Sequence, residues 1–403
     1  MKHRFAPPVR RRHVQGHGTF RRHGSRRRMK HRKTSSSSSR PSGVTRRGAL
    51  GLAGLGLSSL GLAGGLATPA LAQTTIEWKM VTTWPADQPG PGVSASRICD
   101  AIARLSGGRM RVRLFPAGGL VAGGEVFDAV SAGTAQMGHA SPAFWQDRLP
   151  AAVFFSAVPF GLLPYEHVTW LEQGGGMGLW ERLYAPFGIK PLMGGNSGPQ
   201  LGGWFMRPVM SLEDLRGLRI RMTGLGGEVM RRLGATPVSL PPAEIVPALQ
   251  SGLLDAAEFL GPEADRAMGF QNVSKLCYTP GFHEPNGASE TLINQVAYDG
   301  LPDDLKGVIV AACRMETLHS IAESAWRNSE ALRQLVGEDG VELRRFPQPV
   351  MQALQTTSKD VVGALANTGD VARDIHASYI RALERLTPWS EVSDRQMLDG
   401  RTP

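Results

Sequence analysis

The sequence predicts an α/β fold made of two similar lobes and one long helix. Segments typical of strands alternate with helical segments up to about residue 290, a pattern that favours mainly parallel sheets. Within this region, two nine-residue stretches share one spacing of acidic, apolar and glycine residues. Residues 301–337 then have the pattern of one helix of more than thirty residues. Because such a helix is longer than either lobe needs, we expect it to run along both.

The first elements follow directly from residue spacing. The stretch "TIEWKMVTTWP" (residues 75–85) predicts a strand ended by proline. In the next stretch, Ile98, Ile102 and Leu105 share one face of a helix that two glycines close. Strict alternation in "RMRVRLF" (residues 109–115) predicts a second strand.

The internal similarity joins "EVFDAVSAG" (residues 125–133) to "EIVPALQSG" (residues 244–252). Each stretch is followed by a short apolar segment and occupies the same place in a strand–helix–strand run. Short matches also arise by chance, but the shared position favours two similar α/β lobes.

The C-terminal part has a different character. Residues 301–337 begin with an acidic first turn and end at a glycine, and residues 341–347 predict a strand. The helical pattern then returns over residues 349–386, with a break expected near Gly369. This last helix has no strand partner in the pattern, so it packs either on its own body or on a second subunit.

The formal net charge of +10 belongs to the N-terminal region. Residues 1–47 hold 16 Lys plus Arg and no Asp or Glu, whereas residues 73–403 hold 29 basic and 35 acidic residues, a net of −6. This acidic body excludes an electrostatic surface for DNA, and we expect no nucleic-acid partner.

The first 72 residues are typical of a disordered basic leader followed by an export signal. Twin arginines in "TRRGAL" precede an apolar run, and "TPALAQ" offers a cleavage site after Ala72. A membrane anchor is the alternative, but seven glycines between Gly48 and Gly65 and a proline at Pro69 make the run weakly apolar. A twin-arginine signal places the mature chain in a bacterial periplasm.

Motifs for common enzyme chemistry do not appear. The chain has no G-x-S-x-G and no H-E-x-x-H, and its three cysteines fit no zinc spacing and form no disulfide framework. The stretch "GLGGE" lacks the third glycine of a dinucleotide-binding loop and the G-K-S/T of a P-loop.

The residues before "GLGGE" suggest a binding function instead. Alternation in "LRGLRIRM" puts Arg219 and Arg221 on one strand face. The C-terminal end of such a strand opens into a ligand crevice, where an arginine can clamp a carboxylate with two parallel hydrogen bonds. From spacing alone, two solvated strand charges are the simpler interpretation.

A set of runs in the same order resembles one family. They include "WKMVTTWP", "GGEVFDAVSAGTAQMGHAS", "GPQLGGWF", "DLRGLRIRMTGLGGEVM", "LLDAAEFLGPEAD" and "PGFHEP", and together they span nearly all of residues 76–395. The mature chain thus resembles the substrate-binding subunits of tripartite ATP-independent periplasmic (TRAP) transporters, of the DctP-like type. Within that family it is most similar to the 2-oxo-acid or mannitol/chloroaromatic-type branch.

The resemblance implies a two-lobed periplasmic binding protein fold with a long helix spanning both lobes. Ligand would bind in the cleft between the lobes, which close around it. We expect lobe I to comprise residues 73–198 and 287–326. Lobe II would then comprise residues 199–286 and 327–403 with the C-terminal helices.

The resemblance also assigns roles to individual residues. Arg221 falls on the arginine that grips the ligand carboxylate. A cation sits beside the ligand in this branch, and Na⁺ or Ca²⁺ suits the oxygen donors that the matching positions supply. Those positions are Gln200, Glu258, the main-chain carbonyl of Phe259, and Glu284.

Several positions depart from the branch pattern. The usual tryptophan is here Phe259, and the two tyrosines that precede Trp145 are Ala143 and Phe144. Phe144, Trp145 and Trp204 are expected to line or support the cleft. The cleft should therefore be less polar and roomier than one built for pyruvate.

The predicted function is periplasmic capture of a small organic carboxylate, of 2-oxo or hydroxy acid type, with a bound cation, for delivery to TRAP membrane subunits. No enzymatic activity is expected, and a homodimer through the C-terminal helix is one option. Three alternatives stay open from sequence: a sensor that presents the carboxylate to a receptor kinase, a cation-free dicarboxylate binder, and an enzyme on the same scaffold.

Overall fold

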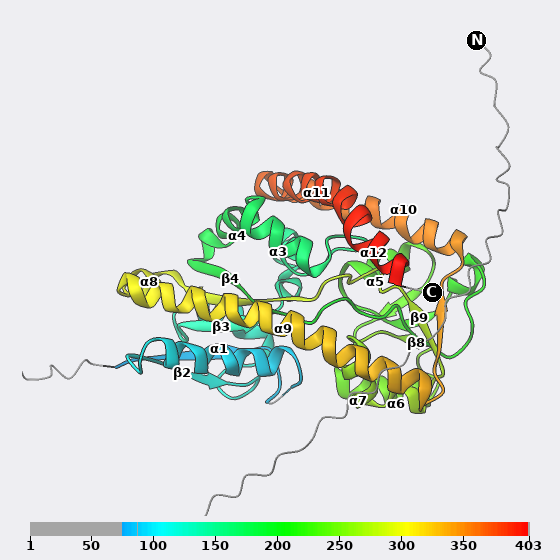
Figure 1. Cartoon of the computed structure of the whole chain (residues 1–403), viewed down its shortest axis with the longest axis horizontal. Helices are drawn as coiled ribbons and strands as arrows, with labels where there is room; N and C mark the ends of the chain where they lie inside the picture. The colour runs from blue at the N-terminus through cyan, green and yellow to red at the C-terminus, as the bar shows by residue number, and fades with distance from the viewer. Residues whose placement is uncertain (1–74, 87, 402–403) are drawn as a thin grey trace, which may run out of the picture. The chain divides into compact units, whose positions relative to one another are not determined.

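The computed structural model describes residues 75–86 and 88–401 (Figure 1). The chain divides into two units, Met1–Thr68 and Pro69–Pro403, and only the second contains described residues. The predicted leader, twin-arginine signal and cleavage site therefore lie outside the described residues. Within the described ranges, no helix combines the length and the apolar character that crossing a membrane requires.

The first sheet has five strands. In spatial order they are β2 (Met110–Phe115), β1 (Ile76–Thr82), β3 (Met137–Ala140), β10 (Ala288–Asn294) and β4 (Ile189–Asn196). One face packs on α1 (Pro91–Leu105) and α9 (Asp303–Gly337). The other face packs on α2 (Val126–Ser131), α3 (Pro164–Gln173), α4 (Gly176–Tyr184) and α11 (Asp370–Ser390).

The second sheet has six strands. In spatial order they are β11 (Glu342–Arg345), β9 (Leu276–Thr279), β5 (Gly203–Phe205), β8 (Ala256–Ala257), β6 (Arg219–Arg221) and β7 (Thr236–Val238). On one face lie α5 (Gly224–Arg232) and α10 (Gln348–Ala364). On the other lie α6 (Pro242–Gln250) and the C-terminal end of α9.

Both sheets are mainly parallel, as predicted, and each contains one antiparallel strand. Strand β10 pairs antiparallel with β3 and β4, and β5 pairs antiparallel with β8 and β9. Each of these strands follows a short segment that crosses between the sheets, residues 197–202 before β5 and residues 280–287 before β10. Each enters its new sheet against the direction of its neighbours.

The internal similarity and the long helix are confirmed. Helices α2 and α6 are each followed by a glycine with positive φ, Gly133 (75°) and Gly252 (73°), and then by a short strand. The shared position of the glycine therefore reflects a turn whose backbone conformation residues other than glycine rarely adopt. Helix α9 has 35 residues and contacts α1 and β4 of the first lobe and α7 (Pro262–Met268) of the second (Figure 1).

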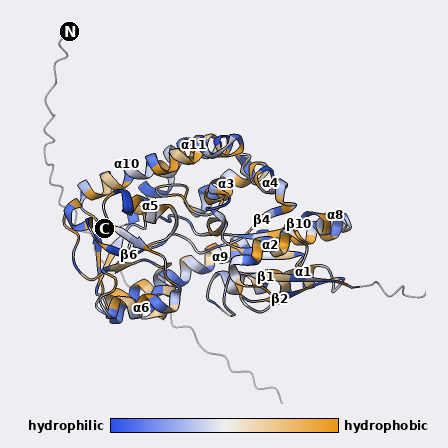
Figure 2. Cartoon of the chain, turned by 180° about the vertical axis from the view of Figure 1, so that it is seen from behind, coloured by the Kyte–Doolittle hydropathy of each residue, from blue (hydrophilic) through white to orange (hydrophobic). Residues whose placement is uncertain are grey.

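The C-terminal helices break at Gly369, as predicted, and both alternate hydrophilic and hydrophobic residues along their length (Figure 2). Helix α11 packs on the first lobe of its own chain, where the Tyr379 hydroxyl accepts from the Leu162 N–H at 2.8 Å. The last described helix is α12 (Gln396–Arg401).

The predicted boundaries of the two lobes remain a prediction. All three cysteines are buried free thiols.

Candidate functional site

The glycines of "GLGGE" lie in the first turn of α5 and allow that helix to begin and pack there. Gly224 begins the helix with a φ of 61°, a conformation that favours glycine. A Cβ at Gly226 would lie 2.5 Å from the His283 Cβ, and a Cβ at Gly227 would lie 2.5 Å from the Met222 carbonyl oxygen. The two glycines therefore allow α5 to pack closely, and this need accounts for the motif without a phosphate.

The two arginines of β6 have different surroundings. Arg219 is exposed and forms a bidentate pair with Asp255 at 2.9 Å. The Arg221 side chain is only 11% exposed, and its Nη1 donates to the Glu258 carboxylate and to the Glu258 carbonyl oxygen, each at 2.8 Å. A solvated strand charge thus describes Arg219 but not Arg221.

A connected polar network extends from Arg221. His283 Nε2 lies 3.4 Å from Glu258 Oε2 and 3.2 Å from Gln200 Oε1. Gln200 Nε2 donates to Glu284 Oε2 at 2.5 Å, and the Gln200 N–H donates to the Glu284 carbonyl oxygen at 3.1 Å. The structure therefore brings together Arg221, Gln200, Glu258 and Glu284, and it adds His283.

The two buried carboxyl groups of this network have pKa values shifted in opposite directions. Burial alone would raise the pKa of Glu258, but Arg221 and His283 outweigh it, so that pKa is lowered. Burial would lower the pKa of His283, yet Glu258 raises it. The pKa of Glu284 is raised to about 7, first by burial and then by the nearby Glu258 charge. Burial and the Glu258 charge thus outweigh the opposing effects of His283 and Arg221 on Glu284.

Phe259 lies beside this network, with the Arg221 guanidinium carbon 5.9 Å from its ring centroid. Trp204 is fully buried, lies opposite Ala257 in the pairing of β5 with β8, and donates from Nε1 to Asp265 Oδ2 at 2.8 Å. Asp265 Oδ1 in turn accepts from the Leu260 N–H at 3.1 Å. Trp204 therefore supports the chain that follows Glu258 rather than lining a cleft.

Phe144 and Trp145 belong to the first lobe, in a short 3₁₀ helix of residues Pro142–Trp145. Trp145 is buried, and its Nε1 donates to Glu290 Oε1 at 2.5 Å. Phe144 is 55% exposed and packs on Trp84, with ring centroids 5.4 Å apart. No contact joins either residue to Arg221 within the described part of the chain, so their role in binding stays a prediction.

Two features escaped the sequence analysis. His283 completes the network around Glu258, and its position directly before Glu284 was the available signal. In the first lobe, Trp84 Nε1 donates to His139 Nδ1 at 2.8 Å, which fixes the Trp84 ring. Burial lowers the pKa of His139 to about 4, so this histidine is a neutral acceptor.

The network also bears on metal binding. Residues 75–86 and 88–401 contain no group of three or more His, Cys, Asp or Glu side chains arranged to hold a metal ion. The set around Gln200 instead combines two carboxylates with amide and main-chain oxygens. Such donors suit hard cations and not zinc.

The chain is similar to several known solute-binding proteins. The chain is 34% identical over 319 residues to a monocarboxylate 2-oxoacid-binding periplasmic protein of Nostoc sp., covering 79% of this chain and 87% of that protein. A TRAP solute-binding protein of Bordetella bronchiseptica, a mixed-occupancy dimer with copurified calcium and picolinate, superposes with a TM-score of 0.76 at 32% identity and covers 81% and 96% of the two chains. A TRAP solute-binding protein of Pseudoalteromonas atlantica with bound sodium and pyruvate has a TM-score of 0.76 at 33% identity, with coverages of 81% and 99%.

The family assignment covers most of the described chain. Residues 80–368 match bacterial extracellular solute-binding protein, family 7 (DctP). The two-lobed fold, the ordered motifs and these relatives all point the same way. We conclude that the chain belongs to the DctP family, as a solute-binding protein of TRAP transporters.

Proposed function

We propose that this protein captures a small organic carboxylate together with Na⁺ or Ca²⁺ between its lobes and presents it to TRAP membrane subunits. Arg221 grips the carboxylate. Gln200, Glu258, the Phe259 carbonyl and Glu284 hold the cation. The two sheets and the helix α9 that contacts both lobes support the predicted division into lobes.

One observation carries the proposal. Arg221 is held by Glu258 through Nη1 only, and its buried Nε has no hydrogen-bond partner within the described residues. A buried N–H without a partner is costly, and a ligand carboxylate supplies the missing acceptor. Because Glu258 already fixes the guanidinium, its remaining N–H groups are aimed before the ligand arrives.

The donor set fits a hard cation. Glu258 and Glu284 are close enough for the Glu258 charge to raise the pKa of Glu284, and an anionic ligand beside them would add to the repulsion. A bound cation would supply the positive charge that offsets both carboxylates and the ligand. In two relatives the bound cations are calcium and sodium, respectively, which matches the oxygen-only donors here.

The aromatic residues favour a ligand larger or more apolar than pyruvate. Phe259 packs beside Arg221, and Phe144 offers an exposed ring on the facing lobe. Neither carries a polar group that could hydrogen-bond a ligand. A 2-oxo or hydroxy acid with an apolar chain, or an aromatic carboxylate, would use both the arginine and these rings. Because the family binds solutes, we propose that the protein performs no chemistry on them.

A thermal-shift screen tests the function. The mature protein is heated with a panel of organic acids, each with and without Na⁺ or Ca²⁺. A ligand that binds only the native state raises Tm by mass action, and we expect carboxylates to do so most strongly when a cation is present. If no carboxylate raises Tm under any of these conditions, the proposed function is wrong. Equal shifts without cations would instead favour a cation-free binder.

Two further parts of the proposal concern the chain ends. The periplasmic location follows from the family, and we propose export through the twin-arginine signal with cleavage after Ala72. N-terminal sequencing of the exported protein should begin at Gln73. Replacing Arg46 and Arg47 together with lysine should leave the precursor in the cytoplasm.

We also propose a homodimer through the C-terminal helix. Apolar side chains near the end of the chain, including Trp389, Val392 and Met397, are between 54% and 61% exposed. Burial of these side chains against a second copy would stabilise the pair. Light scattering after size exclusion should give the dimer mass for the mature chain and the monomer mass after truncation at residue 388.

A further inference from the structure

Two segments of the chain cross between the sheets and lie side by side. Residues 197–202 join β4 to β5, and residues 280–287 join β9 to β10. The Ser197 N–H donates to the Gly287 carbonyl oxygen at 2.9 Å, and the Gln200 N–H donates to the Glu284 carbonyl oxygen at 3.1 Å. A change in the angle between the lobes must therefore bend both segments together.

The two segments approach each other closely at two glycines. A Cβ at Gly281 would lie within 2.3 Å of the Gln200 carbonyl oxygen, and one at Gly287 within 2.0 Å of the Ser197 hydroxyl. At Gly281 a side chain would meet the backbone of the other segment, so glycine is required there; at Gly287 it would displace the Ser197 hydroxyl. The segments thus form one tight hinge element.

A buried amide pair ties this element to the rest of the molecule. Asn196 Nδ2 donates to Asn286 Oδ1 at 2.5 Å. The Asn196 N–H donates to the Ser320 hydroxyl on α9 at 2.9 Å. Asn286 Nδ2 donates to the Ser156 carbonyl oxygen at 2.6 Å and lies 3.0 Å from His167 Nδ1. A displacement at the hinge therefore reaches α9 and the first lobe directly.

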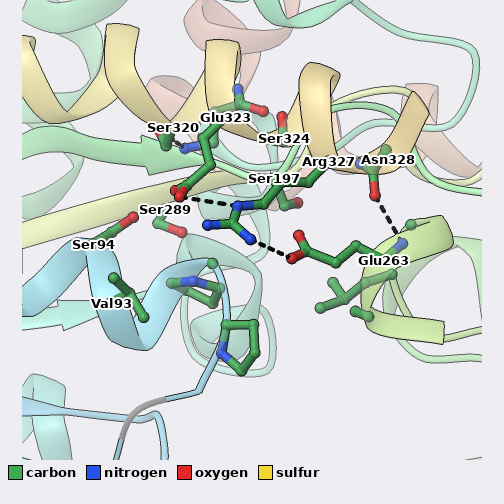
Figure 3. A pocket seen from close by; sticks show the side chains of 17 residues that line it. Val93, Ser94, Ser197, Glu263, Ser289, Ser320, Glu323, Ser324, Arg327 and Asn328 are labelled. Atoms are coloured by element: carbon green, nitrogen blue, oxygen red, sulfur yellow. Dashed lines mark hydrogen bonds and ion pairs between the residues drawn. The ribbon is translucent and has the colours of Figure 1, made fainter. Parts of the chain in front are cut away.

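A cavity of about 260 Å³ lies beside the hinge. Its walls come from α1, α7 and α9 and from Asn196, Ser197 and Ser289 (Figure 3). Arg327 on α9 crosses one side of it, pairing with Glu263 of α7 at 3.4 Å and with Glu323 at 3.2 Å. The cavity gives the two lobes room to approach each other next to α9.

The side chains proposed to hold the cation face each other across the same hinge. Gln200 lies on one segment and Glu284 on the other, and in this structure they bond through Gln200 Nε2. To act as cation ligands, Gln200 would have to offer Oε1 instead, and Glu284 would have to give up this hydrogen bond. Glu258, on the second lobe, would be drawn toward the same point.

We propose that Gln200 and Glu284 make the cation site part of the hinge, so that Na⁺ or Ca²⁺ alone, before any carboxylate, shifts the lobes toward the closed arrangement. This inference rests on the proposed function and concerns its regulation. It makes the binding order definite: cation first, and then a carboxylate that meets a pocket already partly closed. By linkage, each then strengthens the binding of the other.

The test measures the distance between the lobes. Spin labels at Arg104→Cys on α1 and Glu213→Cys in the second lobe, both exposed positions, report the distance by pulsed electron resonance. We expect CaCl₂ alone to shift the distribution to shorter distances. Glu284→Gln should weaken Ca²⁺ binding roughly tenfold or more and remove the shift, whereas Glu263→Gln, which changes a carboxylate on the cavity wall, should keep it.

The outcomes separate the two proposals. Ca²⁺ that binds in calorimetry but leaves the distance distribution unchanged overturns the hinge inference, and so does the absence of Ca²⁺ and Na⁺ binding. Neither result bears on carboxylate binding, which the thermal-shift screen decides. If Glu284→Gln does not fold, Gln200→Ala serves as the second variant. The Ca²⁺ response of the unmodified protein tests the inference even if neither variant folds.

Discussion

Glu258 and Glu290 are buried to the same depth, one in each lobe, yet their charges differ. Glu258 is 3% exposed and Glu290 is 0% exposed. Glu258 faces Arg221 and His283, which lower its pKa against the effect of burial. Among the described residues, Glu290 accepts from two neutral donors, Trp145 Nε1 at 2.5 Å and the Tyr184 hydroxyl at 2.9 Å, and burial raises its pKa to about 8.

The difference shows that the neighbouring groups, and not the extent of burial, determine whether a buried carboxyl group of this protein is ionised. In the second lobe a buried ion pair fixes the Arg221 guanidinium beside Glu258. In the first lobe a protonated carboxyl only braces Trp145 and Tyr184 within the core. Ionic partners thus keep the buried Glu258 charged, which fits its proposed role at the ligand site, whereas Glu290 has neutral partners that fit a structural role.

The largest expected effect separates these two glutamates. Glu258→Gln leaves Arg221 and His283 buried without their counter-ion, and breaking a buried pair in this way costs about 3–5 kcal/mol of unfolding free energy. Glu290→Gln replaces a group that is already neutral near pH 7, so it should cost about 1 kcal/mol or less. Urea unfolding followed by tryptophan fluorescence, without cation or carboxylate, measures both. Equal losses would show that Glu290 is ionised in the folded protein.

The next effect concerns binding by Arg221. Arg221→Ala leaves the ligand carboxylate without its partner and should weaken carboxylate binding by about 2–5 kcal/mol in calorimetry. Arg221→Lys is the matched variant, because it keeps the positive charge beside Glu258 but cannot form bidentate hydrogen bonds to a carboxylate. We expect Arg221→Lys to unfold like the unmodified protein and still bind poorly. Near-native affinity in either variant would remove Arg221 from the ligand site.

The sequence predicted the fold well where signals are local. Strand alternation, helix ends and the repeated helix–glycine–strand unit all appear where expected. Residue spacing alone could not choose between Arg219 and Arg221, because the choice depends on Glu258, which strand pairing brings next to Arg221; only the family resemblance selected Arg221. The sequence also missed the antiparallel strands β5 and β10, which follow the crossings between the sheets. Glu290 left no signal, because a protonated carboxyl inside a strand has no pattern of its own.

A further effect is the pH dependence that Glu290 adds to stability. Its pKa rises from an ordinary 4.5 to about 8 on folding, so the folded chain holds a proton that the unfolded chain releases. The stability linked to Glu290 is therefore complete below about pH 4.5 and is lost as pH rises toward 8. Between these values, the unfolding free energy of the unmodified protein relative to Glu290→Gln should fall by up to about 1.4 kcal/mol per pH unit. A difference that stays constant from pH 5 to 8 would contradict the assignment.

The smallest expected effect tests whether the first lobe contributes to ligand selection. Phe144 is exposed and packs on Trp84, which His139 holds in place. If its ring meets an aromatic carboxylate, Phe144→Ala should weaken picolinate binding relative to pyruvate by roughly 0.5–1.5 kcal/mol, the range of an aromatic pair. Tyr165→Ala, which removes an exposed ring elsewhere on this lobe, is the control and should change neither affinity. An unchanged picolinate-to-pyruvate ratio in Phe144→Ala would leave ligand selection to Phe259, because it is the ring that packs beside Arg221.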